Sequence, residues 1–316
     1  MLNQQQDRVA WIGLGLLGAE LAPHLQTYLA AQSLPNLTVW NRSPEKSQAL
    51  QSKLPSIQAA VSIDELITLH KANIIFTSLQ NDDAVQQVYS VLTSLAASAS
   101  YPIIFVETGT LYPDLSVRLQ TEITNLSIKT PGTPKHVFLQ CPVFGRPEAA
   151  RAAQMVWVTS GDPAAIQQVL PYINAMSRQV LDLKTTDVAA GATMKLLGNF
   201  MLGSMIEVIA ESTNLARKSN LDPQHLIAFV DTFLPAPAIK DYSRRLTGGE
   251  EAPGAVGMTV NVMSKDMGLL KKWGDEKKSP LPTAGLLLKN LDAAREKGFT
   301  QNWNFMVDAL NNSEHD

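Results

Sequence analysis

The chain of 316 residues has one cysteine, few histidines and no marked excess of either charge. Its single cysteine, Cys141, excludes an internal disulfide and a cluster of thiolate metal ligands. The five histidines lie far apart in the sequence, without the spacing of two ligands on one helix face, so we expect no metal site. Lysine and arginine total 26 against 29 acidic residues, and the net charge of −3 gives no support to a nucleic-acid-binding surface.

The sequence also lacks an obvious membrane or export segment. Its N-terminal stretch, MLNQQQDRVAWIG, contains no apolar run of the kind found in secretory signals. The longest uncharged segment, residues 84–106, is interrupted by polar residues and by Pro102, which predicts a helix, a loop and a strand rather than a membrane span. We therefore expect a cytoplasmic protein with no membrane partner.

Apolar residues are nevertheless plentiful enough to build a core. Hydrophobic residues make up 45% of the chain and charged residues 17%, and the length predicts two domains at about 150 residues each. The first half alternates short apolar runs with segments of helical spacing, which is typical of right-handed βαβ units. The predicted fold class is therefore α/β, with an N-terminal Rossmann domain built on a doubly wound parallel sheet. Strands are expected over residues 8–12, 37–40, 73–78, 103–107, 137–140 and 155–160.

The second half of the chain is predicted to be helical. Residues 186–219 have the spacing of one long helix that connects two domains. We expect an N-terminal α/β domain over residues 1–185 and a second domain over 186–316, made of the connecting helix and an all-helical part. Further helices are expected over 223–233, 260–273, 282–297 and 303–310, with loops rich in glycine and proline over 234–257.

A glycine-rich turn follows the first expected strand and opens a helix. In this context Gly13 permits a tight turn, Gly15 lets the backbone approach a pyrophosphate, and Gly18 allows the helix to pack closely on the sheet. The helix N-terminus supplies unpaired N–H groups and a partial positive charge for that anion. The turn, which fits G-x-G-x-x-G and is predicted to bind a dinucleotide, consists of Gly13, Leu14, Gly15, Leu16, Leu17 and Gly18.

The end of the second expected strand indicates which dinucleotide binds. NAD-specific folds place an aspartate or glutamate there, where the carboxylate bonds the ribose 2′-hydroxyl. This chain has Asn41, Arg42 and Ser43 instead. No carboxylate is present to repel a 2′-phosphate, and Arg42 can hold one with two parallel hydrogen bonds. The predicted cofactor is therefore NADP(H).

With several further motifs in the same order, the chain resembles the β-hydroxyacid dehydrogenase family over residues 8–310. Within that family it looks most similar to the glyoxylate/succinic semialdehyde reductase branch. The motifs are Leu79-Gln80-Asn81-Asp82-Asp83-Ala84-Val85 (like L-P-x-x-x-A-V), Glu107-Thr108-Gly109-Thr110 with Pro113 (like D-x-S-T-x-x-P), Cys141-Pro142-Val143-Phe144-Gly145 (like A-P-V-S-G), Gly191 with Lys195 and Asn199, and Lys265-Asp266.

The resemblance implies an NADP-dependent oxidoreductase that acts on CH–OH or C=O groups. Lys195 would be the general acid that protonates the carbonyl oxygen as hydride arrives, and Asn199 would hold the substrate oxygen or orient the lysine. Together with Gly191 and Gly203 these residues recur every four positions, so they share one helix face. The resemblance further implies cofactor contacts from Leu79, Gln80, Thr110 and Lys265.

The chain departs from the family pattern where the substrate is expected to bind. Phe144, Gly145 and Arg146 stand where the family has S-G-G, a segment that usually binds a substrate carboxylate. Arg146 could meet a small carboxylate, or the Phe144 ring could shape a pocket for a larger or more apolar carbonyl substrate. Gly109 and Gln80 also replace a serine and a proline of the family pattern.

Two other functions are compatible with the sequence. An imine reductase shares the two-domain plan, but members of that group usually carry another residue where Lys195 stands, so the lysine favours carbonyl chemistry. Phe144 mildly favours a non-catalytic dinucleotide-binding scaffold, whereas the presence of both Lys195 and Asn199 argues against one. In each case the apolar helices of the second half predict a homodimer, which a monomeric mass at micromolar concentration would contradict.

Overall fold

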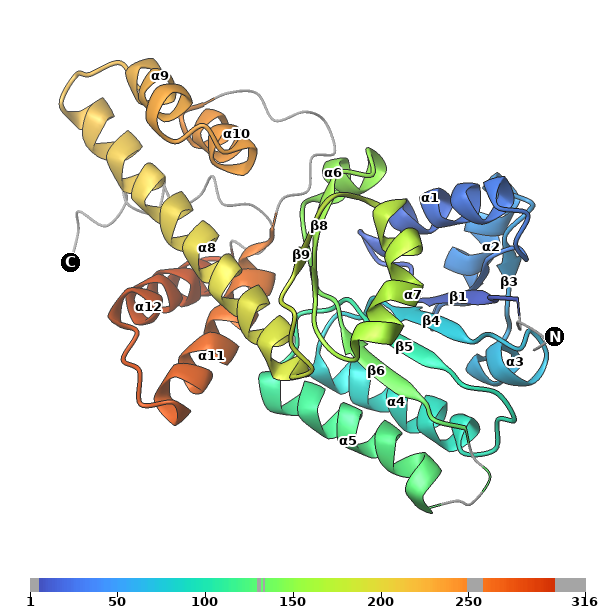
Figure 1. The fold of residues 1–316 in the computed structure, drawn as a ribbon. Coiled ribbons are helices and arrows are strands. Elements are labelled where there is room, and N and C mark those ends of the chain that lie inside the picture. The colour runs from blue at the N-terminus through green and yellow to red at the C-terminus, as the bar shows by residue number, and fades with distance from the viewer. Residues whose placement is uncertain (1–5, 130–131, 133, 249–257, 299–316) are drawn as a thin grey trace. The chain divides into compact units, whose positions relative to one another are not determined.

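The computed structural model describes residues 6–129, 132, 134–248 and 258–298 (Figure 1). By its internal contacts the chain divides into two compact units, Met1–Lys195 and Leu196–Asp316, and the division falls inside one long helix. The functional domains expected over 1–185 and 186–316 stay a prediction. The helix expected over 303–310 lies outside the described residues.

The first unit is built around a six-stranded parallel sheet with the order β3-β2-β1-β4-β5-β6. Because the order reverses direction at β1, the helices cover both faces, as Figure 1 shows, and the predicted doubly wound α/β fold is confirmed. The elements are β1 (Val9–Ile12), α1 (Gly18–Ala31), β2 (Thr38–Trp40), α2 (Pro44–Lys53), β3 (Gln58–Ala59), α3 (Ile63–Thr68), β4 (Ile74–Thr77), α4 (Asp82–Ala96), β5 (Ile104–Glu107), α5 (Pro113–Lys129) and β6 (Val137–Gln140).

The central strands are buried on both faces, which explains why their sequences are continuous apolar runs. Successive residues of a strand point to opposite sides. Trp11 and Phe76, whose rings stack at 5.5 Å, join the core beneath α1 and α7, whereas Ile12 and Ile75 join the core beneath α3, α4 and α5. The sheet therefore lies between two apolar layers, and its strand ends are held rigidly.

A second, three-stranded sheet follows β6. The strand expected over residues 155–160 belongs to it and is joined to the first sheet by an isolated bridge between Gln140 and Ser160. Pro142 follows the end of β6 and has no backbone N–H with which to continue the ladder. The elements of this part are β7 (Val143–Phe144), α6 (Pro147–Arg151), β8 (Met155–Thr159), α7 (Pro163–Asn174) and β9 (Ser177–Asp182), with β7 antiparallel and β9 parallel to β8.

Helices make up the described part of the second unit. The long helix expected over 186–219 is α8 (Val188–Lys218), which begins in the first unit and continues into the second. The prediction of a loop over 234–257 is wrong in part, because this segment contains a helix, α10. Pro237 occupies the first turn of α10, where its missing N–H costs nothing, and Tyr242 and Leu246 are buried. The other helices are α9 (Gln224–Phe233), α10 (Pro237–Leu246), α11 (Val260–Glu276) and α12 (Pro282–Glu296).

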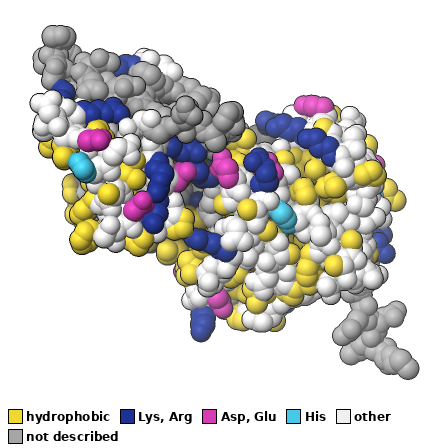
Figure 2. Space-filling view, turned by 90° about the horizontal axis from the view of Figure 1, so that it is seen from above, with side chains coloured by type: hydrophobic (Ala, Val, Ile, Leu, Met, Phe, Trp, Pro, Cys, Tyr) yellow, Lys and Arg dark blue, Asp and Glu magenta, His cyan; other side chains and the backbone are white. Residues whose placement is uncertain are grey.

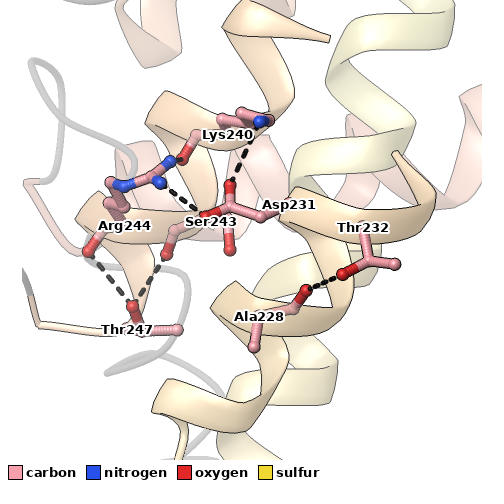
Figure 3. A network of polar contacts seen from close by, with 7 residues as sticks. All are labelled: Ala228, Asp231, Thr232, Lys240, Ser243, Arg244 and Thr247. Carbon is pink, nitrogen blue, oxygen red and sulfur yellow. Dashed lines mark hydrogen bonds and ion pairs between the residues drawn. The ribbon is translucent and has the colours of Figure 1, made fainter. Parts of the chain in front are cut away.

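A polar network joins α9 to α10 (Figure 3). Asp231 accepts a hydrogen bond of 2.7 Å from Nη2 of Arg244 and lies 3.7 Å from Nζ of Lys240. The Thr247 hydroxyl donates to the carbonyl oxygens of Ser243 and Arg244 and so closes the end of α10. The charged side chains are a third to a half exposed, so each pair adds little stability, and the network sets orientation more than it supplies free energy.

Helix α8 is long and apolar enough to span a membrane by length and composition alone. Its most apolar window has a mean hydropathy of 1.2, and 44% of that window is buried. Core helices of soluble proteins have the same properties, so this is weak evidence for a membrane. The helix packs closely at Gly203, where an added Cβ would lie 2.8 Å from Cε of Met263 on α11.

Candidate cofactor and catalytic site

The glycine-rich turn between β1 and α1 is tightly packed at its two ends. Gly13 has a φ of +97°, and a Cβ there would lie 2.2 Å from the carbonyl oxygen of Ser78. A Cβ at Gly18 would lie 2.1 Å from the carbonyl oxygen of Gly13. Around Gly15, by contrast, no described atom lies within 4 Å of an added Cβ. The turn is therefore fixed by close packing, yet its middle glycine borders open space, as a backbone that approaches a ligand requires.

Asn41, at the end of β2, fastens this turn from the side. Its Oδ1 accepts a hydrogen bond of 2.8 Å from the backbone N–H of Leu14, and its Nδ2 donates to the carbonyl oxygen of Ser43. Arg42 is exposed, and Ser43 is the residue that precedes the first turn of α2. The structure thus brings the predicted residues 41–43 next to the predicted glycine turn, as expected for the two parts of one dinucleotide site.

The loops after β4 and β5 meet the same edge of the sheet, because the two strands are parallel neighbours. Leu79 contacts the glycine turn, since its Cδ2 lies 3.3 Å from a Cβ built on Gly13. Gln80 is exposed and follows Leu79 directly, while Thr110 is half-buried in the loop after β5. Leu79, Gln80 and Thr110 therefore lie in loops at the carboxyl ends of the strands, where α/β sheets bind their ligands.

A buried carboxyl group, absent from the predicted site residues, supports the loop that carries Thr110. Glu107 is fully buried at the end of β5, and its Oε2 accepts a hydrogen bond of 2.5 Å from the Thr77 hydroxyl. Its Oε1 accepts from the backbone N–H of Gly109 at 2.7 Å. Burial raises the pKa of Glu107 to about 7, against the lowering effect of these hydrogen bonds. The only signal in the sequence was an acidic residue at the end of an apolar strand.

The contact between Glu107 and Gly109 explains why both residues depart from the family motif D-x-S-T. The Glu107 side chain is one methylene longer than the aspartate of the motif and folds back over the following loop. A Cβ at Gly109 would lie only 2.7 Å from Oε1 of Glu107 and 3.3 Å from the carbonyl oxygen of Leu79. The serine of the motif therefore does not fit beside Glu107 without a shift, whereas glycine does.

The start of α8 is packed directly against the ends of β6 and β8. A Cβ at Gly191 would lie 2.4 Å from Oγ of Ser160 and 2.9 Å from the carbonyl oxygen of Gln140. The same Gln140 side chain donates to the carbonyl oxygen of Gly109 at 3.1 Å and accepts from the hydroxyl of Ser116. This chain of contacts connects the loop after β5 to α8, one turn before Lys195.

Lys195 is buried, with 9% of its surface exposed. Its Nζ lies 4.2 Å from the centroid of the Phe144 ring, a distance typical of a cation–π contact. The structure therefore brings together Lys195 and Phe144, which the sequence predicted to act on the substrate. Gly145 follows with a φ of +147°, and the Arg146 guanidinium lies 3.8 Å from the carboxylate of Glu148.

In the second unit, a buried aspartate connects two further predicted residues. Asn199, one turn beyond Lys195 on α8 and 2% exposed, donates a hydrogen bond of 2.6 Å from Nδ2 to Oδ2 of Asp266. Lys265 lies 3.1 Å from the other carboxylate oxygen of Asp266, which is itself fully buried. Asp266 thus fixes the amide of Asn199, a role that the sequence predictions did not assign although the Lys265-Asp266 motif was noted.

These residues fit a nicotinamide dinucleotide. The open space at Gly15, the N-terminus of α1 and the side chains after β2 give the pyrophosphate and the ribose their expected partners. Figure 2 shows one face of the molecule, on which basic side chains occur in small groups among apolar and uncharged ones, several of them beside acidic side chains. The basic side chains that this view shows therefore form no broad basic surface.

The contrast between Gly15 and Gly18 gives a test of this fit. Gly15→Ala is expected to leave the melting temperature unchanged and to weaken dinucleotide binding by at least about tenfold, because the new methyl group stands only in the ligand's space. Gly18→Ala is expected to lower the stability by about 1–3 kcal/mol, because its methyl group overlaps the backbone of Gly13. Thermal denaturation and NADPH fluorescence titration measure the two effects. Unchanged affinity in Gly15→Ala would contradict the assignment of the turn.

Comparison with known proteins identifies a dinucleotide-binding domain in this chain. The family described as the NAD binding domain of 6-phosphogluconate dehydrogenase matches residues 8–186, more than half of the chain. Glyoxylate/succinic semialdehyde reductase 1 of Arabidopsis thaliana is 24% identical over 92% of this chain and 93% of its own length.

Solved structures show the same fold. The 3-hydroxyisobutyrate dehydrogenase of Mycobacterium tuberculosis, in a structure with L-serine, aligns with a TM-score of 0.77 at 18% identity, over 97% of this chain and 99% of that one. Psf3, in complex with NADP⁺ and 2-OPP, aligns with a TM-score of 0.76 at 21% identity, over 96% of this chain and 99% of that one.

Fold, site and comparisons together define an oxidoreductase with a nicotinamide-dinucleotide-binding domain. More closely, the chain belongs to the β-hydroxyacid dehydrogenase family, as the resemblance in its motifs predicted.

Proposed function

We propose that this protein is an NADPH-dependent oxidoreductase that transfers hydride between the nicotinamide and an aldehyde or ketone of the β-hydroxyacid or semialdehyde type. The observation that carries the proposal is Lys195, a buried ammonium group at the family's catalytic position, held over the Phe144 ring and one turn beyond the close packing at Gly191. Buried, held lysines of this kind suit proton transfer better than exposed ones, because their geometry is fixed before the substrate arrives.

The dinucleotide, when bound, supplies or accepts the hydride. Lys195 donates a proton to the carbonyl oxygen in reduction and takes it from the hydroxyl in oxidation. Asn199 holds the substrate oxygen or orients Lys195, and its own amide is held by Asp266. Residues 13–18, with Leu79, Gln80, Thr110 and Lys265, bind the dinucleotide, while Phe144, Gly145 and Arg146 line the substrate side.

Preference for NADPH over NADH is proposed for Asn41, Arg42 and Ser43. Asn41 is already engaged with the glycine turn, so the exposed Arg42 is the residue that remains to pair with a 2′-phosphate. Arg42→Ala is expected to raise the KM for NADPH by about 10- to 100-fold and to leave the KM for NADH unchanged. The variant loses the charge-assisted hydrogen bonds between the guanidinium and the 2′-phosphate, a group that NADH does not have. Lys53→Ala, at the far end of α2, is the matched control, and equal KM changes for both cofactors would contradict the proposal.

The proposed reaction is tested by NADPH consumption with a panel of aldehydes, oxoacids and imines. Turnover of a carbonyl compound supports the proposal. Turnover of imines alone would indicate imine reduction instead, and NADPH binding without turnover of any compound would favour a non-catalytic scaffold.

We also propose that the protein is a homodimer that associates through its second unit. Exposed apolar side chains occur along α8 at Met201, Val208 and Leu215, and on α9 the exposed rings of Phe229 and Phe233 stack at 4.9 Å. Burial of such a surface against a second copy favours association. The cytoplasmic location expected from the sequence stays a prediction.

A further inference from the structure

Phe144 occupies a fixed position on the short strand β7. Its neighbour Val143 pairs with Trp157 of β8, and both are buried in the core beneath α1. Successive residues of a strand face opposite sides, so Phe144, which pairs with Val156, faces away from that core. The turn that follows is tightly packed, since a Cβ at Gly145 would lie 2.5 Å from Sδ of Met155. The ring therefore has little freedom to leave its place beside Lys195.

The Phe144 ring binds the catalytic ammonium group through its face. Nζ of Lys195 lies 4.2 Å from the ring centroid, well within the range at which the negative face of an aromatic ring attracts a cation. A serine at this position would offer a hydroxyl to a substrate carboxylate, and phenylalanine has no such group. Phenylalanine in place of serine thus removes a hydrogen bond to the substrate and adds a cation–π contact that holds Lys195.

The guanidinium of Arg146, two residues after Phe144, is already paired with a protein carboxylate. Nε of Arg146 lies 3.8 Å from Oε2 of Glu148, and only 22% of the Arg146 side chain is exposed. A substrate carboxylate would have to compete with Glu148 for this guanidinium. An uncharged substrate would meet the apolar ring without such competition.

We propose that Phe144 makes this enzyme selective for uncharged, apolar aldehydes or ketones over carbonyl compounds that carry a carboxylate, and that it positions Lys195 through the face of its ring. The inference rests on the proposed carbonyl reduction and narrows its substrate class. Its two parts make different demands on the side chain, because selectivity needs apolar bulk whereas positioning of the lysine needs an aromatic face.

The test compares butanal with succinic semialdehyde, which has a carboxylate at the other end of a four-carbon chain. Wild type is expected to favour butanal by at least about tenfold in kcat/KM, and Phe144→Ser to shift that ratio at least about tenfold towards succinic semialdehyde. Phe144→Leu, which keeps the bulk but not the ring, is expected to retain the preference for butanal and to lose about threefold to thirtyfold in kcat with little change in KM. Phe144→Tyr, which keeps the ring face, is expected to keep the kcat of the wild type.

A binding measurement without turnover accompanies the kinetics. Calorimetry of the protein with NADP⁺ is expected to show tighter binding of butyramide than of succinamate, and the order is expected to reverse in Phe144→Ser. Melting temperatures identify any variant that is merely unfolded. Where Phe144→Ser fails to fold, the wild-type ratio of the two substrates decides the selectivity, and the Leu and Tyr variants decide the positioning of Lys195.

A preference of the wild type for succinic semialdehyde, or an unchanged ratio in Phe144→Ser, overturns the selectivity while the proposed reductase function stands. Equal kcat in the Leu and Tyr variants overturns the positioning of Lys195. If wild type reduces no carbonyl compound, the proposed function fails, and the calorimetric order of butyramide and succinamate then decides whether Phe144 selects the ligand.

Discussion

Lys195→Met is expected to lower kcat for carbonyl reduction by at least about 100-fold while the affinity for NADPH stays within about twofold. Proton donation by a positioned side chain contributes roughly 10²- to 10⁴-fold to such reactions, and methionine keeps the length of the side chain without the proton. Because Lys195 is held over Phe144 and not by the glycine turn, its loss leaves the dinucleotide site intact. Steady-state kinetics and NADPH fluorescence titration measure the two quantities separately.

Lys218→Met is the matched control, because it removes an exposed lysine from the other end of the same helix. It is expected to leave both kcat and NADPH affinity unchanged. If Lys195→Met keeps wild-type turnover, Lys195 is not the general acid. A common loss of NADPH affinity and stability in Lys195→Met would instead indicate a structural role for the buried lysine.

Much of the fold could be predicted because local patterns and global packing agree in the first unit. The apolar runs that form β1, β4 and β5 are buried on both sides, so their composition alone indicated a parallel sheet. The spacing of Gly13, Gly15 and Gly18 is equally local, since each glycine answers a steric demand within one turn.

Contacts between distant segments were not predictable in the same way. Asn41 was assigned to the cofactor through its position after a strand, but its hydrogen bond to Leu14 depends on the pairing of β1 with β2. The contact of Phe144 with Lys195 joins positions far apart in sequence, and only the structure shows it. Helix α10 differs from the expected loop because Pro237 and the surrounding prolines are typical of loops, whereas a proline in the first turn of a helix is favourable.

The protonation of Glu107 is set by the residues around it, which the sequence alone does not bring together. Besides Thr77 and Gly109, three titratable groups face it, namely Asp82, Tyr89 and Cys141. The burial of Tyr89 and of Cys141 raises the pKa of each group, that of Cys141 to about 12, and the charge of the nearby Glu107 carboxylate adds to the rise. No cation is among the groups that act on Glu107 in the described part of the chain, so the neutral carboxyl is favoured.

Glu107→Gln is therefore expected to remove a pH dependence of stability between pH 4.5 and about 7. Well below pH 4.5 the carboxyl is protonated in both states and contributes no difference. As the pH rises to about 7, the unfolded chain ionises while the folded protein keeps the proton, so unfolding is favoured and the stability of the wild type falls. A shift from 4.5 to about 7 corresponds to about 3 kcal/mol, and glutamine, which is always neutral, avoids this loss.

Urea denaturation of the two proteins from pH 4.5 to 8 measures the effect. The glutamine oxygen can accept from the Gly109 N–H, and its amide can donate to the Thr77 oxygen when the Thr77 hydroxyl, which donates to Glu107 in the wild type, turns to the Val106 carbonyl oxygen. Glutamine therefore replaces the protonated carboxyl without leaving either neighbour unpaired. The difference in unfolding free energy between Glu107→Gln and wild type is expected to grow with pH and to level off above about pH 7. The pKa of Glu207 is also raised by burial, so the wild type slopes in the same direction for a second reason, and only this difference isolates Glu107. Glu45→Gln, an exposed change on α2, is expected to show no such divergence, and parallel curves for Glu107→Gln would mean that its carboxylate is already accommodated when charged.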